Sequence, residues 1–449
     1  MKQAIPVLIF VLLTPAIGKG KENIKAGAAK INITPAVPIW MSGYAARTKP
    51  SEGVLAPLWA KALALEDGRG GRAVIVTTDL IGLPREVTDV VAAQAMEKYK
   101  LERGAVVFNS SHTHTGPVVR GNLSVMGAQS PEQRAVVAEY GEELKGKLLT
   151  AIGAALGDLS PAKLSFDYGE AGFAVNRRQM TAKGVVIGMN AEGPVNHRVP
   201  VLRVTAPNGK VRAILFGYAC HNTTLTAEFY KLSGDYAGFA QAEVERQFPD
   251  AVALFVQLCG GDQNPNPRSR LELAEQHGKS LGAEVARVAQ TAMQPVSGRL
   301  RAEYQTVALP FAPHTREQYE RDLKDANVYK VRRAEMMLKQ YDERREVRQL
   351  QYPVQAIRFE KGFTLVALGG EVVVDYGLWA QREWPKERLM VAGYSNDVAC
   401  YIPTARILKE GGYEPVDSMI YYGQPGPFTE EVEPRIHEGM RQVMRRVTK

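Results

Sequence analysis

Two histidines separated by one residue, His112 and His114, are the residues whose types and spacing first suggest chemistry. They stand in the segment 108–117 (FNSSHTHTGP), directly behind the apolar run 104–108. In an extended backbone, residues i and i+2 point to the same side, so both imidazoles can face one pocket. One imidazole can then bind a metal ion while the other moves a proton. The alternative is that both side chains only cap a strand and bond to backbone.

Further polar side chains follow apolar runs elsewhere in the chain, namely Asp79, His221, Asp262 and Glu371. If these runs are strands of one sheet that end at the same edge, the side chains meet the histidine pair there. Each residue also has a plainer interpretation. His221 can be a hydrogen-bonded core histidine, Glu371 a turn residue in a Gly-Gly-Glu bend, and Asp79 a strand-end cap. Asp79 can also orient a histidine ligand through a hydrogen bond.

The elements that must position these side chains alternate along the sequence. Strands are expected at 29–34, 58–66, 73–78, 104–108, 211–218, 251–258, 300–309 and 363–368, and helices at 85–99, 133–155, 235–248 and 272–293. This rhythm predicts an α/β fold. Residues 164–201, rich in Gly, Asn and Arg, are expected to be dominated by loops. Residues 319–348 are expected to form an exposed, charged helix.

Composition excludes several classes of protein. The chain has 449 residues, of which 45% are hydrophobic, as in a packed globular protein. Its net charge is +8, but acids and bases are mixed and no aromatic-rich basic stripe occurs, which argues against nucleic-acid binding. The three cysteines (Cys220, Cys259 and Cys400) match neither a disulfide scaffold nor a CxxC zinc pattern, and we expect small buried side chains.

The N-terminus has the layout of a secretory signal. A short basic start is followed by a largely apolar middle and the small-residue end Gly18-Lys19-Gly20. We therefore expect residues 1–20 to be a signal peptide, with export to the periplasm or beyond, and residues 21–449 to form a single catalytic domain. An uncleaved N-terminal anchor is the alternative. No other stretch is long and apolar enough to cross a bilayer.

Several short motifs follow one another in a characteristic order. They are SSHTHTGP at 110–117, Asn176-Arg177, Cys220-His221, SGDYAGFA at 233–240, GGD at 260–262, GGE at 369–371, and YIPT at 401–404 with a further tyrosine at 413. Together with ITP at 33–35 and MSGY at 41–44, they resemble the neutral/alkaline non-lysosomal ceramidase family. The resemblance covers roughly residues 26–427. It implies that family's α/β catalytic domain, with mixed sheets flanked by helices, without the C-terminal immunoglobulin-like domain.

The resemblance also implies a zinc site. In the family, zinc held by two histidines, a glutamate and a tyrosine activates a water that attacks an N-acyl amide. The implied zinc ligands of this chain are His112, His221, Glu371 and Tyr401. His114 would then donate or shuttle a proton, while Arg177 and Tyr413 would contact the reacting group and stabilise negative charge. Without the resemblance, Tyr401 would be taken for a packed aromatic residue and Arg177 for the partner of a surface acid.

One position departs from the family's pattern. The family carries a catalytic serine in a pattern like GDxSP, whereas this chain reads Gly261-Asp262-Gln263-Asn264-Pro265. A carboxamide can bond to a substrate, but it has no hydroxyl and is no nucleophile. A mechanism that depends on that serine therefore fails here, and ceramide becomes doubtful as the substrate.

We expect a secreted, zinc-dependent hydrolase of an N-acyl amide, with metal-activated water as the nucleophile. The expected substrate is a small molecule, a lipid or a glycan derivative, and no obligate protein partner is evident. Two alternatives remain. The same metal site can act on a glycosidic, lactone or uronate linkage, or the chain can be a non-catalytic binding protein on this fold.

Overall fold

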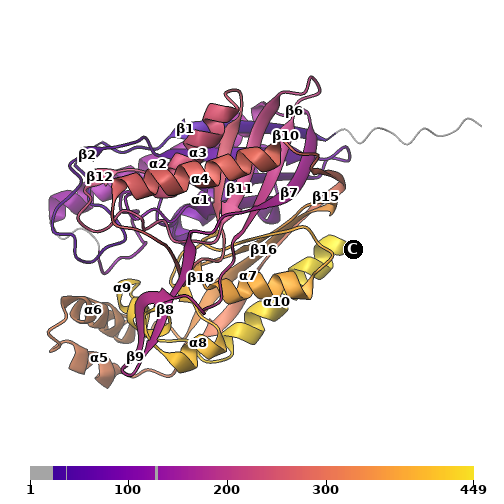
Figure 1. The fold of residues 1–449 in the computed structure, drawn as a ribbon. Helices are drawn as coiled ribbons and strands as arrows, with labels where there is room; N and C mark the ends of the chain where they lie inside the picture. Colours follow the sequence, from indigo (N-terminus) through magenta and orange to yellow (C-terminus); the bar gives the residue numbers. More distant parts are fainter. Residues whose placement is uncertain (1–23, 37, 127–129) are drawn as a thin grey trace, which may run out of the picture.

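A five-stranded and an eight-stranded sheet lie face to face in the computed structural model of the chain, with helices on their outer faces (Figure 1). The structure describes residues 24–36, 38–126 and 130–449. The expected signal segment, residues 1–20, lies outside these ranges. The layered arrangement confirms the predicted α/β fold of mixed sheets flanked by helices.

The five-stranded sheet has the order β5-β4-β3-β1-β6. Its strands are β1 (Lys25–Asn32), β3 (Trp59–Glu66), β4 (Arg72–Thr78), β5 (Val106–Ser110) and β6 (Ser160–Pro161). Helices α1 (Arg85–Tyr99) and α2 (Pro131–Gly157) cover its outer face. In β4, Val74 and Val76 pack towards these helices, while Ala73 and Ile75 pack towards the other sheet. Both faces are buried, which explains why β4 and β5 are continuous apolar runs.

The eight-stranded sheet has the order β13-β11-β10-β7-β15-β16-β17-β19. Its strands are β7 (Lys163–Glu170), β10 (Arg198–Thr205), β11 (Val211–Tyr218), β13 (Val252–Gln257), β15 (Gln294–Pro310), β16 (Gln349–Lys361), β17 (Thr364–Leu368) and β19 (Leu389–Ala392). Helices α3 (Asp235–Gln247) and α4 (Leu271–Ala289) pack on the β10-β11-β13 part. Helices α7 (Val374–Glu383) and α10 (Val432–Thr448) pack on the β15-β16-β17 part.

The prediction of loops over 164–201 is wrong. This range contains β7, the start of β10, and a hairpin of β8 (Ala174–Thr181) and β9 (Gly184–Asn190). Most residues of β9 are exposed, and the hairpin lies at the lower end of the molecule in the view of Figure 1. A strand that buries no continuous face needs no apolar alternation, so the sequence carried no strand pattern there.

The prediction of one charged helix over 319–348 is also wrong. Two helices, α5 (Arg316–Asp322) and α6 (Val328–Asp342), take its place. The side chain of Asn327 accepts a hydrogen bond from the backbone N–H of Tyr329 and so caps the start of α6. Asparagine is a preferred N-cap residue, so Asn327 marks the start of a second helix. The helical spacing of the charged residues, on which the prediction rested, does not reveal this boundary.

Short elements complete the chain and bring the two sheets together at one edge. They are β2 (Gly53–Val54), β12 (Lys231–Leu232), β14 (Gln263–Pro265), β18 (Glu371–Val372), β20 (Tyr401–Ile402), α8 (Ala405–Glu410), the π-helical turn η2 (Tyr413–Asp417), α9 (Ser418–Tyr421) and the 3-10 turn η1 (Arg103–Ala105). The candidate residues follow β4 and β5 of one sheet and β11, β13 and β17 of the other. Two sheets therefore supply the site, and the expectation of a single sheet edge is wrong.

No helix in the described ranges meets the length and apolarity that a bilayer span requires.

Candidate metal and catalytic site

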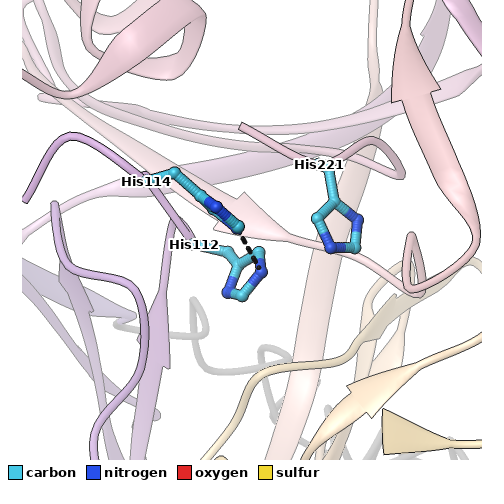
Figure 2. A group of neighbouring side chains, drawn as sticks. All are labelled: His112, His114 and His221. Atoms are coloured by element: carbon cyan, nitrogen blue, oxygen red, sulfur yellow. Dashed lines mark hydrogen bonds between the residues drawn. The ribbon is translucent and has the colours of Figure 1, made fainter. Parts of the chain in front are cut away.

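His112 follows β5 in a left-handed backbone conformation, with φ 62°. Its backbone N–H donates to the carbonyl oxygen of Leu80 (2.9 Å), and its Nδ1 lies 2.7 Å from the carbonyl oxygen of Ile81. The segment is therefore not the extended strand assumed from the HxH spacing. The imidazoles of His112 and His114 nevertheless face one site, with their Nε2 atoms 3.1 Å apart and their rings nearly perpendicular (Figure 2).

His221 approaches from the other sheet, after β11 (Figure 2). Its Nδ1 lies 2.8 Å from the carbonyl oxygen of Gly260. Because a carbonyl oxygen only accepts, Nδ1 of both His112 and His221 carries the proton in these contacts. Each Nε2 is then directed at the carboxylate of Glu371.

Glu371 lies on β18 and is buried. Its Oε2 lies 2.9 Å from Nε2 of His112 and 3.0 Å from Nε2 of His221, while Tyr422 donates its hydroxyl proton to Oε1. Burial alone would raise the pKa of this carboxyl; positive charge at the two imidazoles holds the pKa well below its usual range, and a cation bound between the same atoms has the same effect. The carboxylate is therefore ionised and central to the site.

Tyr401 completes the group from β20, which pairs with β18 so that Tyr401 stands opposite Glu371. Its hydroxyl oxygen lies 3.0 Å from Nε2 of His221 and accepts a hydrogen bond from Nη2 of Arg177 (3.0 Å). Burial raises the pKa of this phenol well above its usual value, and the positive charge of Arg177 opposes that rise.

The donor set of this group fits a metal ion. Burial, helped by Arg177, lowers the pKa of His221 to about 4, so its imidazole is neutral at pH 7 and Nε2 carries a lone pair. That lone pair faces Oε2 of Glu371, for which no hydrogen-bond donor exists among the described residues. Two lone pairs 3.0 Å apart in a buried site repel each other unless a cation lies between them. Two nitrogens and two oxygens are a ligand set that zinc accepts.

The three histidines form a second possible ligand set. One nitrogen of each of His112, His114 and His221 lies within 4.8 Å of the others, and all three side chains are buried. This buried group can hold a metal ion. Glu371 contacts His112 and His221, whereas the Nε2 contact of His114 is to His112.

His114 lies at the margin of the group and is 9% exposed. Its ring packs against Tyr44 with 4.8 Å between ring centroids, and Arg47 donates to its carbonyl oxygen (2.7 Å). Its Nδ1 has no hydrogen-bond partner in the described part of the chain. Burial holds the pKa of His114 well below its usual value, and any positive charge on His112 or His221 would lower it further. A neutral imidazole at this place can accept a proton.

Arg177 reaches the site from β8 and is fixed by Glu414, a residue that sequence reasoning missed. Glu414 is 1% exposed, and its Oε1 accepts from Nε of Arg177 (2.9 Å), while Oε2 pairs with Arg178. Although burial opposes it, contact with Tyr401 and Glu414 raises the pKa of Arg177 well above its usual value. The only sequence signal for Glu414 was its place directly after Tyr413, inside the family motif.

Tyr413 and Asn264 both lie close to the guanidinium of Arg177. The Arg177 guanidinium carbon lies 5.6 Å from the ring centroid of Tyr413, whose ring centroid lies 5.5 Å from that of Tyr401. The side-chain oxygen of Asn264 lies 3.4 Å from both Nη1 of Arg177 and Oγ1 of Thr223, and accepts from both. The structure thus brings all seven predicted site residues together.

Asp79 and Asp262 have structural contacts and touch no histidine of the site. Asp79 accepts from the backbone N–H of Trp59 and from Gln241, each at 2.9 Å, which supports the strand-end cap. Asp262 accepts from the backbone N–H of Val374 (2.8 Å). The histidine ligands are instead oriented by backbone carbonyl groups, which sequence reasoning could not identify.

Comparison with known proteins gives a consistent result. The sequence profile described as "Neutral/alkaline non-lysosomal ceramidase, N-terminal" matches residues 24–298. The neutral ceramidase of Pseudomonas aeruginosa is 26% identical in an alignment 337 positions long, which covers 69% of this chain and 48% of that protein. Neutral ceramidase B of Dictyostelium discoideum is 25% identical in an alignment 271 positions long, which covers 56% of this chain and 36% of that protein. The chain thus spans about half the length, or less, of these relatives.

Two solved structures share the fold. The crystal structure of neutral ceramidase from Pseudomonas aeruginosa superposes with a TM-score of 0.68 at 21% identity, over 88% of this chain and 70% of that chain. A structure described as "Ceramidase complexed with C2" superposes with a TM-score of 0.69 at 20% identity, over 90% of this chain and 73% of that chain.

Proposed function

The chain belongs to the neutral/alkaline non-lysosomal ceramidase family, and we propose that it is a zinc-dependent hydrolase that cleaves an N-acyl amide. The observation that carries this proposal is the meeting of four ligand atoms, Nε2 of His112 and His221, Oε2 of Glu371 and the hydroxyl of Tyr401, at separations of 2.9–3.0 Å. A zinc ion held by these atoms supplies Lewis-acid chemistry, since it activates water and polarises an acyl carbonyl.

His114 handles the proton in this proposal. Its burial and its histidine neighbours favour the neutral imidazole, which can take the proton that the attacking water releases. The same proton is then delivered to the nitrogen of the leaving amine, which departs as a neutral group. Its position at the margin of the group supports this role over that of a fifth ligand.

Arg177 stabilises the negative charge that forms on the acyl oxygen. Its guanidinium stays charged because Tyr401 and Glu414 contact it, and Glu414 keeps it from turning away. In a site from which most water is excluded, a preoriented cation stabilises a transition state by several kcal/mol, of the order of 3. The guanidinium lies over the ring of Tyr413, and in this proposal the Tyr413 hydroxyl donates to the substrate.

The substrate we propose is a lipid amide of the ceramide type, because the relatives are named ceramidases. Asn264 gives a specific reason for a second candidate, since it stands where the family pattern has a serine. With no hydroxyl there, the same metal site acting on a glycosidic, lactone or uronate linkage is the alternative.

We also propose that residues 21–449 form one catalytic domain and that residues 1–20 direct export. Sequencing the N-terminus of the protein recovered from a cell envelope or medium fraction tests the proposed export signal. A new N-terminus near residue 21 supports the proposal, whereas the intact Met1 in the cytoplasm rejects it.

The function is tested by a hydrolysis panel on zinc-loaded protein, with ceramide, shorter N-acyl amines, aryl glycosides and lactones as substrates. We expect cleavage of at least one amide, abolished in the Glu371→Ala variant. Cleavage of a glycoside or lactone without any amide would favour the second candidate. Absence of any hydrolysis in a protein that holds zinc would favour a binding role.

A further inference from the structure

A charged cavity with a volume of about 560 Å³ lies far from the histidine site. Its walls are the turn between β3 and β4, the segment before β5, β15 and the end of α10. The first two of these walls lie at the amino ends of β4 and β5, whereas the histidines follow the carboxyl end of β5. The length of the seven-residue strand β4, about 20 Å, therefore separates the cavity from the metal site.

Six cationic side chains line this cavity, but only two acidic side chains do so. The cations are Arg72, Lys100, Arg299, Arg301, Arg446 and Lys449, and the acids are Glu102 and Glu303. Glu303 lies 4.0 Å from Arg446. Across the ranges that the structure describes, the other five cations have no carboxylate within ion-pair distance, while most arginines on the outer helices have one. The positive charge in the cavity is therefore largely uncompensated.

The frame of the cavity is rigid, although its cations are long side chains. Asp67 is buried, and its carboxylate accepts from the backbone N–H groups of Arg69 (2.8 Å), Gly71 (2.8 Å) and Leu300 (2.7 Å). Asp67 thus ties the β3–β4 turn to β15. The Asp67 side chain itself is not among the residues that line the cavity. A Cβ atom at Gly71 would lie only 2.5 Å from the carbonyl oxygen of Leu300, so the two walls are in close contact.

We propose that this cavity binds a small soluble anion that carries two or more phosphate groups. A guanidinium presents donors in a fork that matches phosphate oxygens, and Arg72, Arg299 and Arg301 supply three such forks. Like charges gathered on the walls of a cavity repel each other in the absence of a ligand and concentrate the field on an anion. The volume is in the range of small-molecule sites.

The test uses fructose 1,6-bisphosphate as the probe, with fructose as the uncharged control, in calorimetric titrations of the full chain at low ionic strength. We expect saturable binding of one bisphosphate and none of fructose. The double variant Arg299→Gln/Lys449→Gln, at two exposed positions, should bind the bisphosphate about tenfold more weakly. The matched control Lys163→Gln/Lys386→Gln removes the same charge from exposed positions outside the cavity and should bind like the native protein.

Three results would overturn the proposal. The first is no binding of the bisphosphate to the native protein. The second is an equal loss in both double variants, which would mean that only net charge matters. The third is binding to vesicles of anionic phospholipid without binding of the soluble bisphosphate, which would make the basic cavity a membrane contact.

Discussion

At the scale of single residues, two backbone carbonyl groups decide how the site can work. The carbonyl oxygens of Ile81 and Gly260 accept from Nδ1 of His112 and His221, so both Nε2 atoms face Glu371. Neutral imidazoles with their protons held on Nδ1 offer lone pairs on Nε2, which is the state that binds a metal. No side-chain motif encodes these carbonyl groups, so the sequence could indicate the ligands but not what orients them.

Replacement of His114 separates the role of a proton carrier from that of a ligand. We expect His114→Gln to keep the native zinc content while the rate of amide cleavage falls by about 100-fold or more, because general acid–base catalysis contributes that much. Metal analysis and kinetics on the same sample check this. If the variant loses its zinc, His114 is a ligand, and the group of three histidines holds the metal.

Glu414 and Glu410 form a matched pair for testing how Arg177 is held. Glu414→Gln leaves two buried guanidinium groups without their shared carboxylate, and should cost about 3 kcal/mol in the free energy of unfolding. Glu410 pairs with Arg178 at a side chain that is 23% exposed, so Glu410→Gln should cost at most about 1 kcal/mol. Urea unfolding of the three proteins measures both values. Equal losses would contradict the account of Glu414.

At the scale of elements, the site depends on short strands that periodicity cannot reveal. β18 and β20 have two residues each, and their pairing sets Glu371 opposite Tyr401. β14 pairs with β8, which places Asn264 beside the strand that carries Arg177. A two-residue strand shows no alternation, so the sequence did not predict these pairings, and Glu371 and Tyr401 were identified as ligands only through the family resemblance. The long buried strands β4, β11 and β17 were predicted nearly to the residue, because they are continuous apolar runs.

Asp262 links β14 to the start of α7 and gives the fold a pH dependence. Burial, with the charge of Asp375 adding to it, raises the pKa of Asp262 from 3.8 to about 7. The folded protein therefore holds this proton more tightly than the unfolded chain does. The resulting contribution to stability is complete below about pH 4 and is lost as the pH rises to about 7, at roughly 1.4 kcal/mol per pH unit.

The Asp262→Asn variant tests this contribution, because asparagine does not titrate. The free energy of unfolding of the native protein should fall relative to that of the variant between pH 4 and 7, and the difference should be constant at higher pH. Denaturant unfolding at several pH values measures the difference. Parallel curves for the two proteins would show that Asp262 does not titrate in this range.

At the scale of the whole molecule, the sequence predicted the fold class but not how the sheets share the site. Alternating strands and helices indicated an α/β fold, and the structure has that fold. The candidate residues follow strands of two facing sheets, and apolar runs alone do not tell which sheet a strand joins. Residues of the β8–β9 hairpin gave no strand signal, because little of β9 is buried.

The proposed zinc site joins His112 and His221, which follow strands of the two large sheets, to Glu371 and Tyr401 of the β18–β20 pair. The measurement that tests it most directly is the metal content of the purified full chain and of the variants His112→Ala, Glu371→Gln and Lys163→Gln, after dialysis against limiting zinc. We expect about one zinc per chain in the native protein and in Lys163→Gln, and loss of the metal in the two site variants with the fold intact. A native protein that takes up no zinc, or site variants that retain it, would rule out these four residues as the ligands of a zinc ion.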